Sequence, residues 1–411
     1  MHIVQVSKAS QFGGGASHVA EMLHQGLLGL DIASTHYARH PAPGSNTPKS
    51  LAWRNGPLLK AERALQRLER FAGVPYVLPT EYLTLSRLAK RHAVLFHFHD
   101  LSGGLSPLTL YALSRHAPVV WTLHDCSPLT GGCLYPMGCT RYLEHCGECP
   151  QHGIWPLDTQ RDGTRLMRAL QRWVHHHGRI HYVAPSQWLA RLARGTCAIE
   201  PMSVIPNGVD ISLFQPCADR EQLRARLSLP AKRPLVLLTA GDLQDGRKGI
   251  GLARQTLQHL PANVRPFLLL TGRANDAQLK IFEGLEFRHF GYVEDMARLR
   301  EIYAVADAYL NCTLADNFPL SVLESQACGT PVLGFRTGGL PEMVDDGAAG
   351  ALVAQGDVNA LGSVLQRYLR GEIGTDWRQR ARALVVEKFS LKQQLQQHAD
   401  LYRRLLGEGL R

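Results

Sequence analysis

Short apolar runs alternate with longer amphipathic stretches along the whole chain. Uninterrupted apolar runs are typical of strands buried on both faces of a parallel sheet, and amphipathic stretches between them indicate covering helices. The runs of the first half are residues 2–7, 93–99, 119–124, 180–185 and 203–206, and those of the second half are residues 235–240, 266–271, 308–311, 331–335 and 351–353. The pattern predicts an α/β protein with a doubly wound parallel sheet in each half.

A turn-rich segment, PNGVD at residues 206–210, separates the two halves and is followed by a polar helical stretch at residues 219–227. The length of 411 residues also favours two domains over one. We therefore place the boundary at residues 206 and 207. Residues 42–57 are rich in Pro, Gly, Ser and Asn, which predicts a mobile loop.

The composition, 45% hydrophobic and 19% charged residues, is typical of a soluble globular protein. The first ten residues lack the basic start and apolar core of a signal peptide, and no run of about 18 apolar residues occurs. We therefore expect a cytoplasmic protein.

The net charge of +10 predicts attraction to an acidic partner. The sequence has no RNP-like aromatic motif and no basic low-complexity tail, so we expect no nucleic-acid partner. Arginines are spread over the helical stretches 59–71 and 161–172. They favour peripheral contact with an anionic membrane that carries a lipid-linked acceptor, or else form a solvated basic face without a partner.

The segment 316–335, DNFPLSVLESQACGTPVLGF, carries two carboxylates, Asp316 and Glu324, that are separated by seven residues. Pro319 stands where a helix could begin, and Gly329 stands where it could end. A helix N-terminus favours an anion, and carboxylates on either side of it could accept hydroxyl groups. The segment therefore suggests a sugar-nucleotide site. An ordinary helix with a surface Glu is the alternative, because it would give the same sequence pattern.

The segment resembles the acidic-x7-Glu motif of retaining glycosyltransferases of family 4, the "group 1" class. The resemblance implies that Asp316 faces the donor sugar and that Glu324 holds the ribose hydroxyls. Most members have Glu at the first position, so Asp316 is one methylene shorter. The resemblance also includes PNGVD at residues 206–210 and APSQW at residues 184–188.

A second candidate segment is the loop GDLQDGRKG at residues 241–249, after a predicted strand. Lys248 and Arg247 could neutralise a diphosphate there. The Lys-Gly pair matches the family pattern, but Asp242 stands where the family has Arg, and Arg247 is the candidate replacement. The predicted donor-binding residues are Gly14, Gly15, Arg247, Lys248, Asn317, Phe318, Pro319, Leu320 and Glu324.

In the first half, Gly14 and Gly15 follow the opening strand and precede a predicted helix. They resemble the family's N-terminal loop beside the diphosphate. His124 ends a predicted strand and matches the family position that approaches the 6-position of the donor sugar. The resemblance therefore implies Asp316, His124 and Lys248 as the catalytic residues.

Four cysteines, Cys133, Cys139, Cys146 and Cys149, lie in one Gly/Pro-rich loop. Their number equals the ligand count of a structural zinc site, but four thiols packed as small hydrophobic groups are the alternative. The loop resembles a Cys-rich subgroup of exopolysaccharide glycosyltransferases, such as those of colanic acid synthesis.

The resemblance implies a GT-B fold, in which two Rossmann-like domains face each other across a cleft. Residues 1–206 would be the acceptor-side domain, with a C-terminal helix 390–411 packed back on it, and residues 207–389 would bind a UDP- or GDP-linked sugar. The expected reaction is retaining transfer of a hexosyl group to a glycan in exopolysaccharide or other cell-surface polysaccharide synthesis.

No metal is needed for catalysis, since fixed positive charge can replace a divalent ion. The alternatives are a sugar-nucleotide epimerase or hydrolase, a non-catalytic donor-binding homologue, and a zinc-dependent nucleic-acid binder.

Overall fold

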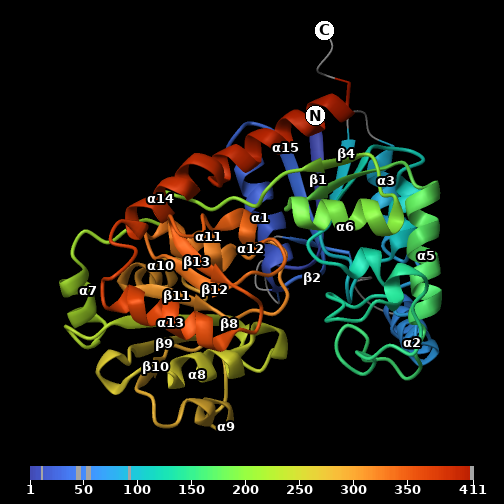
Figure 1. Cartoon of the computed structure of the whole chain (residues 1–411). Helices are drawn as coiled ribbons and strands as arrows, with labels where there is room; N and C mark the ends of the chain where they lie inside the picture. The colour runs from blue at the N-terminus through green and yellow to red at the C-terminus, as the bar shows by residue number, and fades with distance from the viewer. Residues whose placement is uncertain (11–12, 43–47, 52–56, 91–93, 408–411) are drawn as a thin grey trace. The chain divides into compact units, whose positions relative to one another are not determined.

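The structure is a computed structural model that describes residues 1–10, 13–42, 48–51, 57–90 and 94–407. The chain divides into two compact units: unit 1 comprises residues 1–206 and 395–411, and unit 2 comprises residues 207–394 (Figure 1). The division falls in the turn-rich segment that the sequence singles out. The last long helix, α15 (Leu391–Leu405), begins in unit 2, and its residues from 395 onward belong to unit 1.

Unit 1 contains a seven-stranded parallel sheet with the order β3-β2-β1-β4-β5-β6-β7. Its strands are β1 (His2–Ala9), β2 (Ala33–His40), β3 (Lys49–Ser50), β4 (Val94–Phe98), β5 (Val119–Thr122), β6 (Ile180–Ala184) and β7 (Met202–Val204). All five strands predicted for this half are present. Strands β2 and β3 were not predicted, and most of the predicted loop 42–57 lies outside the described residues.

Unit 2 contains a six-stranded parallel sheet with the order β10-β9-β8-β11-β12-β13. Its strands are β8 (Leu235–Asp242), β9 (Phe267–Arg273), β10 (Phe287–His289), β11 (Ala308–Asn311), β12 (Val332–Phe335) and β13 (Gly350–Val353). Only the short β10 was not predicted. Both sheets follow the doubly wound strand order, so the predicted fold class is confirmed.

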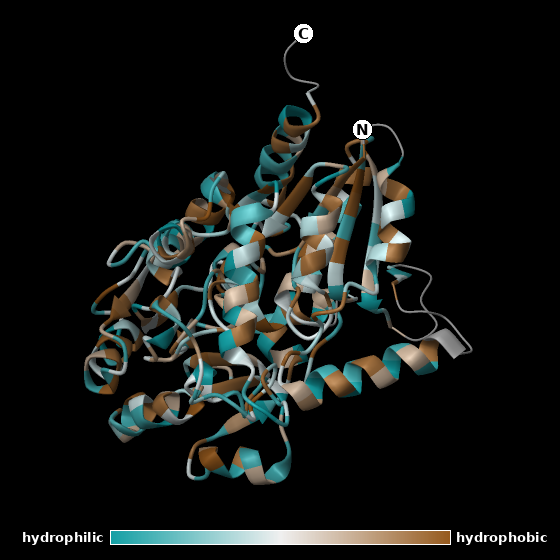
Figure 2. Ribbon diagram, turned by 90° about the vertical axis from the view of Figure 1, so that its right-hand side faces the viewer, coloured by the Kyte–Doolittle hydropathy of each residue, from teal (hydrophilic) through white to brown (hydrophobic). Residues whose placement is uncertain are grey.

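Helices connect the parallel strands and cover the sheets, and Figure 2 shows mostly brown strands beside helices that carry both brown and teal residues. In unit 1 they are α1 (Gly15–Leu28), α2 (Pro57–Ala72), α3 (Tyr82–Ala89), α4 (Pro107–Leu113), α5 (Thr164–His177) and α6 (Gln187–Cys197). In unit 2 they are α7 (Arg220–Arg226), α8 (Ile250–Gln258), α9 (Asp276–Leu279), α10 (Met296–Val305), α11 (Leu320–Ala327), α12 (Leu340–Met343), α13 (Val358–Leu369) and α14 (Trp377–Lys388). No helix among the described residues is long and apolar enough to cross a bilayer.

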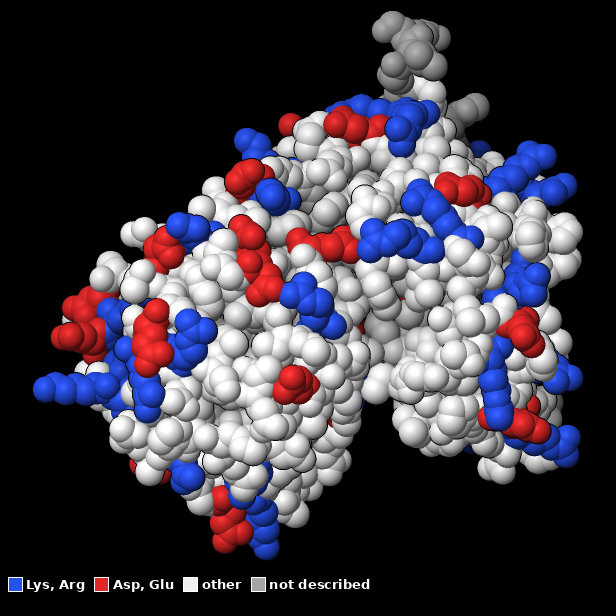
Figure 3. Space-filling model, viewed as in Figure 1, with Lys and Arg blue, Asp and Glu red and all other residues white. Residues whose placement is uncertain are grey.

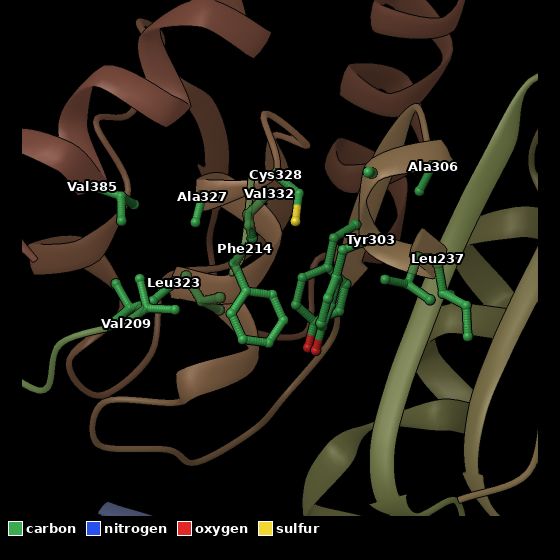
Figure 4. Close-up of a cluster of buried hydrophobic side chains, with 14 of the residues drawn as sticks. Val209, Phe214, Leu237, Tyr303, Ala306, Leu323, Ala327, Cys328, Val332 and Val385 are labelled. Atoms are coloured by element: carbon green, nitrogen blue, oxygen red, sulfur yellow. The ribbon is translucent and has the colours of Figure 1, made fainter. Parts of the chain in front are cut away.

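Each face of the unit 2 sheet has its own hydrophobic core. Leu235 and Leu237 belong to one core, and the alternate residues Val236 and Leu238 belong to the other. This is the period-two alternation of a strand that is covered on both sides. Figure 4 shows the first core, where the rings of Phe214 and Tyr303 meet edge to face at 6.1 Å.

Candidate active site

In unit 2 the strand order reverses between β8 and β11, and doubly wound sheets bind ligands beyond the strand ends at such a point. The loop after β8 ends in a 3-10 turn, η4 (Gly246–Lys248), where the Asp245 carboxylate accepts the backbone N–H of Arg247 at 3.0 Å. Gly249 then has a φ of 65°, and a Cβ there would overlap the carbonyl oxygen of Cys312, the residue after β11. Glycine therefore lets the basic loop lie directly against the end of β11.

Asp316 joins the two basic side chains of this loop. Its Oδ2 lies 2.7 Å from Nζ of Lys248 and 3.4 Å from Nη1 of Arg247. Burial acts to raise the pKa of Asp316, but the two positive charges outweigh it, so the pKa lies below its ordinary value. Asp316 is therefore ionised, and the structure brings three predicted site residues into one charged cluster at the switch point.

Helix α11 begins at Leu320, directly after Pro319. A helix N-terminus directs backbone N–H groups outward and carries a partial positive charge. The loop before it is held by Asn207, whose Nδ2 donates to the carbonyl of Phe318 at 3.0 Å. The predicted donor-binding residues Asn317 and Phe318 are buried beside this helix N-terminus.

Glu324 lies one turn inside α11 and is buried. Its Oε2 accepts the hydroxyl of Tyr303 at 2.9 Å, whereas none of the described residues donates to Oε1. Burial raises the pKa of Glu324 to about 7. The carboxyl is therefore divided between its protonated and ionised forms near neutral pH, and one of its oxygens is available to a ligand.

A glycine turn that was not predicted supports Asp316 from the far side. Gly338 has a φ of 54°, and a Cβ there would overlap the carbonyl oxygen of Asp316. The backbone N–H of Gly339 donates to the same oxygen at 3.3 Å. The sequence signal was the Gly-Gly pair that follows β12 and precedes α12, where any side chain at Gly338 would displace Asp316.

The corresponding switch point of unit 1 lies between β1 and β4. Helix α1 begins there at Gly15, and Gly14 before it has a φ of 115°. A Cβ at Gly14 or Gly15 would meet no atom of the described residues within 4 Å. The two predicted glycines therefore leave the N-terminus of a long helix open to a ligand, as an anion would require.

Two copies of a His-Asp-x-Ser sequence, residues 99–102 and 124–127, follow the neighbouring strands β4 and β5. In each copy the Asp Oδ1 accepts the backbone N–H of the Ser two residues later, at 2.9 and 2.7 Å. The hydroxyl oxygens of Ser102 and Ser127 lie 2.8 Å apart. The two turns are thus tied into one rigid rim at the carboxyl edge of the sheet.

The first residues of the two copies, His99 and His124, pair through their ring nitrogens at 3.1 Å and stack with centroids 5.4 Å apart. Behind them His97 contacts the hydroxyl of Tyr402 in α15 at 2.7 Å. Burial lowers the pKa of His124 to about 4, against the opposite effect of Asp100. His124, a predicted catalytic residue, is therefore a neutral imidazole at neutral pH.

An ion pair and a second carboxyl complete this rim. Lys8, near the end of β1, lies 2.8 Å from Oδ2 of Asp100. Burial, and then the charge of Asp100, raise the pKa of Asp125 to about 6. Unit 1 therefore presents neutral or weakly charged hydrogen-bonding groups at its switch point, together with one Lys–Asp pair.

The four predicted zinc ligands, Cys133, Cys139, Cys146 and Cys149, line one small cavity of about 20 Å³. However, no group of three or more His, Cys, Asp or Glu side chains among the described residues is arranged to hold a metal ion. Burial raises the pKa of Cys133 to about 12 and also raises the pKa of Cys146 and Cys149, which opposes the thiolates that zinc requires. The four thiols do lie together around this cavity, as the sequence predicts. Their arrangement among the described residues favours packed thiols, and zinc binding stays a prediction.

Family models match both units of the chain. A model described as "Glycosyltransferase Family 4" matches residues 13–213, and one described as "Glycosyl transferases group 1" matches residues 234–370. Over 95% of the chain and 97% of the relative, the sequence is 24% identical to WcaC of Escherichia coli K12, which is provisionally assigned as a colanic acid biosynthesis glycosyl transferase. A D-inositol 3-phosphate glycosyltransferase of Xylanimonas cellulosilytica is 35% identical, but over only 42% of this chain and 43% of its own length.

Solved structures share the fold at low sequence identity. Sucrose-phosphate synthase from Thermosynechococcus elongatus superposes with a TM-score of 0.75 at 23% identity, over 99% of this chain and 100% of that one. Anabaena HepE in complex with UDP-glucose gives a TM-score of 0.66 at 18% identity, over 98% and 100% of the two chains. These likenesses show that the two doubly wound units form the GT-B fold.

Proposed function

Because the chain belongs to the group 1 glycosyltransferases of family 4, we propose that it transfers a hexosyl group from a nucleoside diphosphate sugar to a glycan hydroxyl with retention of configuration. The observation that carries this proposal is the cluster of Lys248, Arg247 and Asp316 at the unit 2 switch point, beside the N-terminus of α11. Anabaena HepE, which shares the fold, binds UDP-glucose. This favours a UDP-linked sugar, with GDP as the other candidate base.

The charged cluster suits a site that binds a diphosphate. In the structure, Asp316 neutralises Lys248 at 2.7 Å. An incoming diphosphate would compete for Lys248 and Arg247 and leave the Asp316 carboxylate free to face the donor sugar. The same cations, with the α11 N-terminus, would stabilise the departing nucleoside diphosphate, and fixed charges of this kind usually supply the largest catalytic contribution.

Glu324 is proposed to bind the ribose. Its Oε2 is fixed by the Tyr303 hydroxyl, and Tyr303 is itself locked in the hydrophobic core beside Phe214. This leaves Oε1 as the oxygen that can accept a ribose hydroxyl. The arrangement holds the carboxylate in one position before the ligand arrives, which limits the entropy lost on binding.

Unit 1 is proposed to contribute His124 and the Gly14–Gly15 backbone. A neutral imidazole can donate from one ring nitrogen and accept at the other, so His124 can bind a sugar hydroxyl without placing a charge near the diphosphate. The backbone N–H groups at the open N-terminus of α1, at Gly14 and Gly15, would donate hydrogen bonds to a phosphate oxygen.

The acceptor is proposed to be a lipid-linked glycan at the cytoplasmic face of the membrane, in cell-surface polysaccharide synthesis. Unit 1 has 23 Lys and Arg against 14 Asp and Glu, whereas unit 2 has 22 against 21. Figure 3 shows this contrast on one face. Of the fourteen large hydrophobic side chains exposed among the described residues, twelve belong to unit 1. Basic and exposed apolar groups together favour an anionic lipid surface.

The test is a thermal-shift panel of UDP-, GDP- and ADP-sugars, followed by a turnover assay. A ligand that binds only the folded state stabilises it by about 2.7 kcal/mol at a hundred times its dissociation constant. We expect stabilisation by one nucleotide series. Rapid consumption of the donor without any acceptor would instead indicate an epimerase or hydrolase, and binding without turnover on any glycan acceptor would indicate a non-catalytic homologue.

A further inference from the structure

Unit 1 contains a cavity of about 50 Å³ that the proposed reaction does not yet use. It lies beside the paired turns, and Ser102 and Ser127 both line it. Gln171 of α5 lines the same cavity, together with apolar side chains that include Leu157 and Met167. The lining therefore combines an apolar wall with several polar side chains, among them Ser102, Ser127 and Gln171.

Gln171 is the informative member of this lining. The residue is only 6% exposed, and its Oε1 has no hydrogen-bond partner among the described residues. A buried amide oxygen without a partner is unfavourable, and such groups in folded proteins mark a site that water or a ligand completes.

The polar groups opposite are already held in place. Ser102 and Ser127 bond to each other at 2.8 Å, and both backbone N–H groups are bound by the preceding aspartates. They cannot rotate freely to satisfy the amide of Gln171. An apolar ligand, such as a lipid chain, would leave the buried amide oxygen without a partner, so the ligand must bring a hydrogen-bond donor.

An exposed aromatic ring stands next to the cavity. Trp155 is 50% exposed, and a Cβ built on Gly103, which lines the cavity, would lie 3.4 Å from the indole ring. Lys8 holds the ring from another side, with Nζ 4.5 Å from a ring centroid. A fixed, half-exposed indole offers an apolar plane on which the C–H face of a sugar ring can pack.

The size of the cavity limits what enters it. A volume of 50 Å³ has room for roughly four water-sized groups, which is too little for a whole pyranose ring but enough for a small substituent. An acetamido group has about this size. Its N–H can donate to Oε1 of Gln171, its carbonyl can accept from Nε2, and its methyl group can contact Leu157 and Met167.

We propose that this cavity binds the acetamido group of an N-acetylhexosamine in the acceptor glycan, while Trp155 supports the sugar ring. The inference rests on the proposed function, since it assigns the sugar to the acceptor of a glycosyltransferase. It adds a specificity determinant, Gln171, and a chemical class of acceptor.

The experiment is saturation-transfer NMR on the full chain with N-acetylglucosamine and N-acetylgalactosamine, with glucose and galactose as reference sugars. We expect saturation of the acetyl methyl group in the N-acetyl sugars and at least a tenfold weaker signal from the reference sugars. Gln171→Leu should abolish the acetyl signal without lowering the melting temperature, because it removes an unpaired buried amide. Gln397→Leu, the same change at an exposed position of α15, should leave the signal unchanged.

Two outcomes overturn the inference: wild-type protein that gives no acetyl signal, or a Gln171→Leu variant that keeps it. If Gln171→Leu does not fold, Gln171→Met provides the same test with a flexible side chain of similar length. Nucleotide-sugar binding is measured in the same samples. Nucleotide binding without acetyl binding refutes the cavity assignment alone, and acetyl binding without nucleotide binding refutes the proposed donor site alone.

Discussion

The two units share one strand order but use different chemistry at their switch points. Unit 2 has an ionised cluster, Lys248, Arg247 and Asp316, on a unit whose charges nearly balance. Unit 1 has the neutral pair of His99 and His124, which follow β4 and β5 beside its switch point, yet it carries almost all of the net charge of the chain.

The difference suggests two kinds of ligand. The compact ion pairs of unit 2 suit a small anion, because its phosphate groups can replace Asp316 as the partner of Lys248 and Arg247. Neutral hydrogen-bonding groups discriminate among hydroxyl and amide groups, and a basic, partly apolar exterior suits a large anionic surface. The fold therefore supplies two equivalent sites, and the side chains at the strand ends decide which ligand each one can hold.

The largest effect is expected from Lys248→Ala. The variant loses a charge-assisted contact to the diphosphate, which should cost about 1.5–3 kcal/mol of nucleotide affinity. Turnover should fall about 10²–10³-fold, because the same charge stabilises the leaving group. Calorimetry with UDP and GDP measures the first effect. Lys232→Ala, at an exposed position of unit 2, is the control. Equal nucleotide affinities of the two variants would show that Lys248 does not bind the diphosphate.

Glu324→Gln should increase the stability of the folded protein at neutral pH and weaken nucleotide binding. The pKa of Glu324 is raised from 4.5 to about 7, so the folded state binds its proton more tightly than the unfolded chain does. Stability should therefore fall as the pH rises from about 4.5 to about 7, by roughly 3 kcal/mol in total. Glu324→Gln should remove this loss and weaken nucleotide binding.

Urea unfolding at pH 5 and pH 8 checks this prediction. The variant should gain stability over wild type mainly at pH 8, whereas Glu294→Gln, at an exposed position, should follow wild type at both values. A Glu324→Gln protein with the wild-type pH dependence would show that another group titrates.

Asp316→Asn should lower turnover without lowering nucleotide affinity. Removing the carboxylate frees Lys248 for the diphosphate, so nucleotide affinity should stay constant or increase. Turnover should fall about tenfold to a hundredfold, ~1.4–2.8 kcal/mol, because the charge is needed as positive charge develops on the sugar. Separate kcat and nucleotide Kd measurements check this. Normal turnover would make Asp316 a structural partner of Lys248 only.

Most of the architecture follows from local pattern, because apolar runs identify strands that are buried on both faces. Strand β2 was not predicted because its sequence, ASTHYARH, is polar. Its buried polar side chains are paired instead: His36 lies 2.7 Å from Glu21, and Arg39 contacts Glu62 at 2.5 Å. Such compensation depends on residues distant in sequence and leaves no periodic signal.

The candidate site also combines features that local sequence predicts with features that only packing produces. The spacing of Asp316 and Glu324 and the Lys-Gly pair are local, so they could be predicted. The ion pair between Asp316 and Lys248, the Gly338 turn against Asp316 and the unpaired amide of Gln171 arise only from packing. For the cysteines, sequence proximity predicts clustering, but ligand geometry depends on backbone directions that spacing does not determine.

The smallest effect is expected from Arg67→Ala on the exterior of unit 1. Arg67 is exposed on α2, the helix that also exposes Leu68 and Phe71. A basic residue near an anionic lipid surface contributes about 1 kcal/mol, so vesicle affinity should fall roughly fivefold. Sedimentation with phosphatidylglycerol-rich vesicles measures this, and the difference should shrink as salt screens the charge. Lys232→Ala in unit 2 is the matched control. Equal losses in the two variants would mean that the excess charge of unit 1 does not direct the protein to a membrane, and that the contrast between the units is confined to their switch points.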